Sequence, residues 1–189
     1  ITGSAFSDTL YGSAAEDSLH GGAGNDTLVG SAGADVMDGG TGVDTVDYSG
    51  STSAVSVNLT LGTSSGGYAD GDVLGSIERV VGSAFNDQLI GSESADVLIG
   101  GAGDDVLAGR AGADVLDGGD GYDTADYSAS NTGITLTLDG SVGIGGDAAG
   151  DQVSNIEHIL GSAYADVITG VGADEVLEGG GGDDILTGN

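Results

Sequence analysis

The chain has no cysteine, no proline and only two basic residues among its 189. Without cysteine it cannot be held by a disulfide framework. Its 31 acidic residues give a formal net charge of -29, which argues against nucleic acid as a partner because that ligand needs a basic surface. No apolar run approaches the roughly 20 residues that a transmembrane helix needs, so we expect no membrane insertion. Cations are the partners that this charge favours.

What the chain has in abundance is glycine, 40 residues in all, arranged on a strict period. Glycine-rich, acidic composition is also typical of disordered chains, but here a nine-residue unit recurs in three blocks, 3–47, 82–126 and 161–189. Each unit begins with glycine and has an apolar residue at position eight. Position six is a carboxylate in every unit, Glu175 in one and aspartate in the other 12, namely Asp8, Asp17, Asp26, Asp35, Asp44, Asp87, Asp96, Asp105, Asp114, Asp123, Asp166 and Asp184.

A longer period of 79 residues contains the nonapeptides. It relates Gly3 to Gly82 and Gly82 to Gly161. Between the blocks lie two connectors, 48–81 and 127–160, which align with each other without a gap. Fixed-period self-similarity is typical of repeat proteins, in which each unit buries its apolar face against its neighbours.

Each nonapeptide predicts a turn followed by a short strand. The glycines permit positive φ and close approach of the backbone, and the three residues after position six alternate in direction as in a strand. Two units would form an 18-residue coil, and stacked coils would form parallel sheets with strands about 4.8 Å apart. We therefore predict an all-β fold, a parallel β-roll or β-solenoid. It would be continuous over 1–189, with the connectors forming larger coils.

This stacking would bring the position-six carboxylates of units n and n+2 together. Unpaired, they would repel each other. Calcium takes six to eight oxygen ligands, and it could bind between the two carboxylates and the carbonyl groups of the glycine turns. We expect seven such sites, formed by the pairs Asp8–Asp26, Asp26–Asp44, Asp17–Asp35, Asp87–Asp105, Asp105–Asp123, Asp96–Asp114 and Asp166–Asp184.

Glycines at positions two and four are the expected source of carbonyl ligands, and the connectors offer further carboxylates. Asp72 and Asp151 occupy equivalent positions in the two connectors. The sequence is equally compatible with two roles for these residues, as calcium ligands and as solvated loop aspartates. The glycines are Gly22, Gly24, Gly40, Gly42, Gly101, Gly103, Gly119, Gly121, Gly180 and Gly182.

Several units, among them GGAGNDTLV (21–29), GGAGDDVLA (100–108) and GGGGDDILT (179–187), resemble the RTX, or haemolysin-type calcium-binding, repeat. The resemblance implies a parallel β-roll, one Ca²⁺ between stacked turns, and type I export from a Gram-negative bacterium. Units such as GSAFSD (3–8) depart from it, because they lack glycine at positions two and four. We expect poor coordination there, with Phe6, Phe85 and Tyr164 packing as caps. We expect no site at GVGADE (170–175).

Two classes of function fit these observations. The first is a calcium-binding stalk or lattice segment of a secreted bacterial surface protein, of the adhesin or S-layer type, in contact with neighbouring copies or repeats. The second is an accessory folding and secretion module of a secreted toxin, lipase, protease or epimerase. We expect no catalysis by this chain, and its two histidines, His20 and His158, do not match across the 79-residue period.

Overall fold

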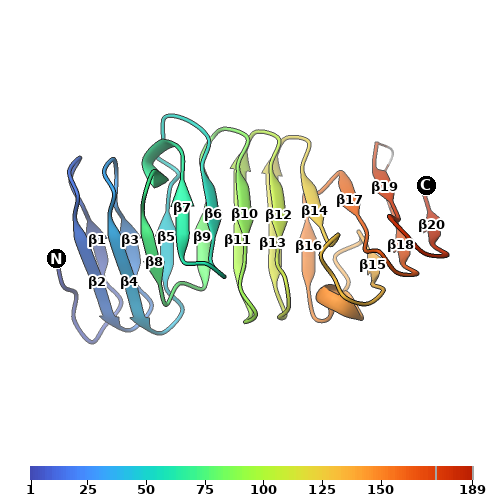
Figure 1. Cartoon of the computed structure of the whole chain (residues 1–189), viewed down its shortest axis with the longest axis horizontal. Coiled ribbons are helices and arrows are strands. Elements are labelled where there is room, and N and C mark those ends of the chain that lie inside the picture. The colour runs from blue at the N-terminus through green and yellow to red at the C-terminus, as the bar shows by residue number, and fades with distance from the viewer. Residues whose placement is uncertain (173, 189) are drawn as a thin grey trace.

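The computed structural model describes residues 1–172 and 174–188. Short strands stack along one long axis, with the two termini at opposite ends of the row (Figure 1). The described residues contain no α-helix, and their only helical elements are two three-residue 3₁₀ turns, η1 (Gly67–Ala69) and η2 (Gly146–Ala148). The prediction of an all-β fold built from stacked parallel strands is confirmed.

One face of the solenoid is a seven-stranded sheet in which every neighbouring pair is parallel. Within a block, partners lie 18 residues apart, as when Leu10 pairs with Leu28. Units n and n+2 therefore stack, as the period predicts. In spatial order the strands are β1 (Thr9–Tyr11), β3 (Thr27–Val29), β5 (Thr45–Asp47), β9 (Arg79–Val81), β11 (Val97–Ala102), β13 (Val115–Asp120) and β16 (Gln152–Ser154).

The remaining strands form a ten-stranded sheet and a three-stranded sheet. In the ten-stranded sheet the order is β19 (Val176–Glu178), β17 (His158–Leu160), β14 (Thr124–Asp126), β12 (Val106–Ala108), β10 (Gln88–Ile90), β6 (Ser56–Asn58), β7 (Thr63–Ser65), β8 (Val73–Gly75), β4 (Val36–Thr41) and β2 (Ser18–Ala23). The small sheet contains β15 (Thr135–Thr137), β18 (Val167–Thr169) and β20 (Ile185–Thr187).

The connectors add larger coils to the stack. In the first connector β5 pairs in parallel with β9 and β4 pairs in parallel with β8, so both sheets gain a strand from it. The first connector also contains an antiparallel excursion, since β7 pairs antiparallel with both β6 and β8. The sequence did not predict this excursion. In the second connector only an isolated antiparallel bridge, Thr135 with Ile144, corresponds to it.

The core is a single file of position-eight side chains between the sheets. Leu19, Leu28, Leu98 and Leu116 are fully buried, and the connectors add the buried rings of Tyr48 and Tyr127. The file thins toward the C-terminal end, where Leu186 is 43% exposed. A core only one side chain deep gives each coil few apolar contacts, so stability must depend heavily on the turns.

The expectation that aromatic residues cap the roll is wrong. The side chains of Phe6, Phe85 and Tyr164 are 79%, 44% and 49% exposed. They occupy position four, at the tip of the turn, and the coil above each one has a glycine there, such as Gly24 over the backbone of Phe6. Since glycine has no side chain, position four of the coil above offers these rings no side chain against which to pack.

Candidate metal centre

A ladder of aspartates runs through each block at the point where turn becomes strand. The backbone N–H of Asp8 donates to Oδ1 of Asp26 at 2.8 Å, and the same bond recurs up the stack at 2.7–3.0 Å. The structure thus brings together all seven predicted pairs. One oxygen of the upper carboxylate is used in each bond, which leaves the other for a different partner. The pairs are Asp8–Asp26, Asp17–Asp35, Asp26–Asp44, Asp87–Asp105, Asp96–Asp114, Asp105–Asp123 and Asp166–Asp184.

Two glutamates of the connectors, which the sequence analysis did not identify, take the place of an aspartate above the last coil of a block. Glu78 Oε2 accepts the N–H of Asp44 at 2.9 Å, and Glu157 Oε2 accepts that of Asp123 at 2.9 Å. Because these residues lie outside the nonapeptide register, counting in nines could not identify them. Their equivalent places in the two aligned connectors were the available signal.

Seven of the aspartates bury an oxygen that has no hydrogen-bond partner among the described residues. The atom is Oδ1 in Asp96 and Oδ2 in the other six, Asp26, Asp35, Asp44, Asp105, Asp114 and Asp123. A buried acceptor without a donor is costly and rare in folded proteins. A cation beside each oxygen would remove that cost. No three His, Cys, Asp or Glu side chains form a metal cluster in residues 1–172 and 174–188, so such an ion would also need backbone ligands.

The turn glycines provide those backbone oxygens. A side chain at Gly40 would collide with the carbonyl oxygen of Gly22, and one at Gly42 with that of Gly24. The carbonyl groups at positions two and four therefore face the coil above. An oxygen-lined space of this kind fits the ligand preference of Ca²⁺. All ten predicted ligand glycines have positive φ, namely Gly22, Gly24, Gly40, Gly42, Gly101, Gly103, Gly119, Gly121, Gly180 and Gly182.

Burial penalises charge on these carboxylates when no cation is present. Burial first, and then the neighbouring carboxylates, raise the pKa of Asp105 and of Asp114 to about 7. Burial likewise raises the pKa of Asp35, Asp44 and Asp123 above the ordinary value. These five aspartates thus face a desolvation cost that a bound divalent ion would offset.

Asp72 and Asp151, the predicted connector ligands, already use both oxygens within the protein. Oδ1 of Asp72 accepts the N–H of Asp35 at 2.8 Å, and Oδ2 accepts the Tyr48 hydroxyl at 2.9 Å. Asp151 repeats this arrangement with the N–H of Asp114 and the hydroxyl of Tyr127. Burial raises the pKa of both carboxyl groups to about 6. These contacts favour a structural role for the Tyr–Asp pairs.

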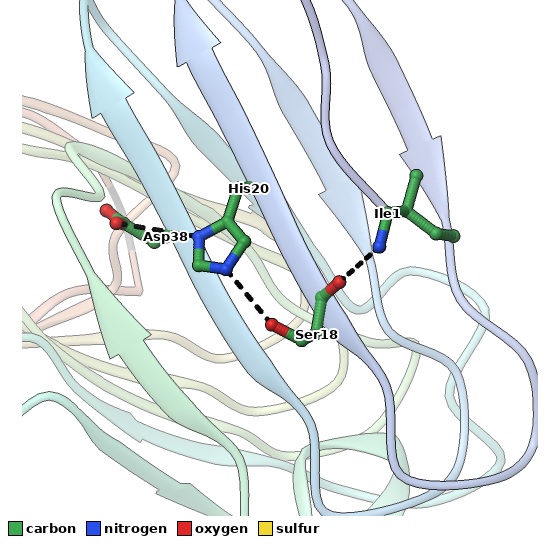
Figure 2. Close-up of polar contacts among 4 residues, drawn as sticks. All are labelled: Ile1, Ser18, His20 and Asp38. Atoms are coloured by element: carbon green, nitrogen blue, oxygen red, sulfur yellow. Dashed lines mark hydrogen bonds and ion pairs between the residues drawn. The ribbon is translucent and has the colours of Figure 1, made fainter.

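A Ser–His–Asp contact on the outer face of the roll tests the expectation of no catalysis. Figure 2 shows His20 between the Ser18 hydroxyl, 3.1 Å from its Nε2, and Asp38, 3.7 Å from its Nδ1. The amino group of Ile1 donates to the carbonyl oxygen of Ser18 at 2.6 Å. The side chains of His20 and Asp38 are about half exposed, so solvent screens the ion pair. The contact joins adjacent coils, since His20 of β2 lies beside Asp38 of β4.

Comparison with known proteins gives one family match. The family model described as RTX calcium-binding nonapeptide repeat (4 copies) matches residues 1–28, 11–46, 75–107, 90–125 and 154–186, which together make up more than half of the chain. No curated protein matches the chain. The described residues contain no helix of the length and apolar character needed to cross a membrane.

Proposed function

Because this chain belongs to the RTX calcium-binding nonapeptide-repeat family, we propose that it is a stalk or lattice segment of a secreted bacterial surface protein that folds on calcium after export. Binding of calcium follows from the family. Secretion, a Gram-negative cell surface and contact with neighbouring copies are parts of the proposal. The elongated row of coils (Figure 1) and the 79-residue superrepeat support a role in spanning distance.

The observation that carries the calcium switch is the set of six buried Oδ2 atoms without a hydrogen-bond partner among the described residues. Aspartates at position six would hold each ion from one side, and the carbonyl groups of glycines at positions two and four would hold it from the backbone. Calcium supplies positive charge to carboxylates that the fold otherwise buries unpaired. The chain itself contributes the register that stacks them.

Folding and binding are therefore linked. The stacked cage requires the coils, so the free energy of binding becomes free energy of folding. With a formal net charge of -29 and a thin core, the ion-free chain should be unfolded. Extracellular calcium modules bind at about 10⁻⁴–10⁻³ M. The low calcium of a cytosol would keep the chain loose enough for export, and the medium outside would fold it.

Circular dichroism of the full 189-residue chain tests the proposal. In chelator we expect the spectrum of a disordered chain, and a cooperative gain of β signal as Ca²⁺ rises into the millimolar range. Mg²⁺ at the same concentration should fail, because it demands tight octahedral geometry and loses its waters reluctantly. A chain already β-rich and protease-resistant in chelator would refute the switch.

The surface context needs a separate measurement. The intact mass of the secreted protein that contains this chain should correspond to further repeats and surface domains. An adjoining catalytic domain would instead favour the second class, an accessory module of a secreted toxin, lipase, protease or epimerase. Both outcomes leave the calcium switch intact, so the two parts of the proposal are tested independently.

A further inference from the structure

The position-six aspartates fall into two groups according to what contacts their carboxylates. The two groups differ at Oδ2, since Asp96 of the second group also buries an Oδ1 without a partner among the described residues. In the units with glycine at position four, Oδ2 is buried without such a partner in six cases. In the units without that glycine, a serine at position two donates to the carboxylate of its own turn. The second group contains five turns, Gly3–Asp8, Gly12–Asp17, Gly82–Asp87, Gly91–Asp96 and Gly161–Asp166, which we call the serine turns.

In all five serine turns the N–H of the serine donates to Oδ2, and its hydroxyl donates to one of the two carboxylate oxygens. In the turn that ends at Asp17, both the N–H and the hydroxyl of Ser13 donate to Oδ2, at 2.6 and 2.8 Å. In the turn that ends at Asp166, the N–H of Ser162 donates to Oδ2 at 2.7 Å and its hydroxyl to Oδ1 at 2.8 Å. Ser4, Ser83 and Ser92 make equivalent pairs of bonds. Two donors thus reach the carboxylate of each serine turn from within the turn.

The residue at position four decides which arrangement forms, and serine at position two is not sufficient. Ser31 also occupies position two, but its turn has Gly33 at position four, and both residues have positive φ, 74° and 127°. No hydrogen bond joins Ser31 to Asp35, whose Oδ2 is without a partner among the described residues. Arg110 repeats this pattern with Gly112, at φ values of 75° and 149°. Positive φ at position two turns the N–H and the side chain away from the carboxylate.

The place of a turn in the stack explains the two types. Serine turns occupy the first two units of each complete block, and Gly161–Asp166 opens the third block. In the coil above, a side chain at Gly22 would collide with the carbonyl oxygen of Ser4, and one at Gly24 would collide with the backbone of Phe6. Later coils must therefore have glycine at position four. The first turns of the second and third blocks lie on connector segments instead, Asp87 on Val55 and Asp166 on Ile134, and can carry side chains.

We propose that the serine turns are ion-free starting coils, in which serine supplies the donors that calcium supplies in the glycine turns. The inference rests on the proposed calcium function and assigns its ions. Each glycine-turn aspartate would hold one Ca²⁺ through Oδ2, with carbonyl ligands from the stacked turns, and the serine-turn aspartates would bind none of their own. The seven ion-holding residues are then Asp26, Asp35, Asp44, Asp105, Asp114, Asp123 and Asp184.

A gain-of-site variant tests this assignment. Ser92→Gly with Ser94→Gly converts GSESAD (91–96) into GGEGAD and removes both donors to Asp96. Calcium bound to the full chain is then counted by equilibrium dialysis with radioactive Ca²⁺. We expect seven ions for the unchanged chain and eight for the double variant.

Ser31→Gly is the matched control, because it changes serine to glycine at position two of a turn that already has glycine at position four. Its count should stay at seven. Ser92→Ala removes only the hydroxyl, so the count should stay at seven. Seven ions in the double variant would overturn the assignment and leave the calcium function standing. No bound calcium in the unchanged chain would overturn both.

Discussion

At the scale of single residues, the position-six aspartate has two separate roles. One oxygen accepts a backbone N–H from the coil below, as Asp105 does for Asp87 at 2.7 Å. The other is available to a cation in the glycine turns or to serine in the serine turns. A carboxylate is required for both roles together, since its two oxygens can accept from different directions.

Substitution of two aspartates by alanine should separate these roles. Asp105 belongs to a glycine turn between two neighbours in its stack, whereas Asp17 belongs to a partly exposed serine turn. Asp105→Ala should raise the calcium concentration at the folding midpoint by about tenfold, the equivalent of ~1.4 kcal/mol, and reduce cooperativity. Asp17→Ala should change it much less. Titration followed by circular dichroism measures both, and equal effects would contradict the difference between the turns.

The buried tyrosines of the connectors give a second prediction at this scale. The Tyr127 hydroxyl is the partner of Asp151 Oδ2 at 2.9 Å. Tyr127→Phe leaves that buried oxygen without its donor, which should cost about 1–3 kcal/mol in the free energy of unfolding with calcium present. Tyr11→Phe, at a side chain 68% exposed, is the control and should be neutral. Urea unfolding measures the difference, and a neutral Tyr127→Phe would contradict a structural role for the Tyr127–Asp151 pair.

At the scale of elements, a strict glycine at position one allows strands to stack this closely. These glycines do not have positive φ. A side chain at Gly100 would instead collide with Oδ2 of Asp105 and the carbonyl oxygen of Gly118. Position one is therefore glycine for lack of space, and positions two and four are glycine for backbone conformation as well.

A single methyl group added at position one should disrupt the pairing of one coil with the next. We expect Gly100→Ala to push the Asp105 carboxylate from its place and to lower both the calcium affinity and the β signal of the middle block. Gly188→Ala is the control, because a methyl group there would meet no atom within 4 Å and its φ is not positive. Calcium titration measures the affinity, and amide hydrogen exchange locates the strands that lose protection. Unchanged protection of the amides in β11 and β13 would show that the coil accommodates the methyl group at Gly100.

The superrepeat also alternates between faces of the roll. β1 belongs to the seven-stranded sheet, but its equivalent 79 residues later, β10, belongs to the ten-stranded sheet. The five units of the first block and the two half-coils of its connector, β6–β8 in one sheet and β9 in the other, make seven half-coils, which is an odd number. Equivalent features such as Phe6 and Phe85 consequently lie on alternate edges.

At the scale of the whole molecule, charge decides stability in the absence of calcium. In the ion-free fold the pKa values of Asp105 and Asp114 are raised to about 7, whereas an unfolded aspartate titrates near 3.9. Between these values the folded state binds more protons than the unfolded state. The stability of the ion-free chain therefore falls as pH rises from about 4 to 7.

This sign predicts that acid partly replaces calcium. Protein dialysed free of metal should be disordered at pH 7.5 and should show more β signal at pH 5. With millimolar calcium the order should reverse, because the ion binds deprotonated carboxylates. Circular dichroism at matched ionic strength checks both arms. More β signal in the metal-free chain at pH 7.5 than at pH 5 would contradict the raised pKa values of Asp105 and Asp114.

The periodic features could be predicted from the sequence because they repeat a local rule. A turn of six residues and a strand of three impose an 18-residue coil, so the pairing of Leu10 with Leu28, the buried position eight and the seven aspartate pairs all follow from counting. The calcium-binding family was also evident from the same units. Register, core and pairing therefore needed no information from distant parts of the chain.

Other features depend on contacts between segments that the period does not relate. Glu78 reaches Asp44 across 34 residues and Asp72 reaches Asp35 across 37, because the larger connector coils bring them onto the same stack. Three more features depend on what lies directly above or below each coil. They are the antiparallel strand β7, the exposure of Phe6 and the hydrogen bonds from serine to aspartate in the serine turns. Stacking sets the space available at each turn, and that space determines whether a carboxylate oxygen accepts from a serine, accepts from a tyrosine or has no donor among the described residues.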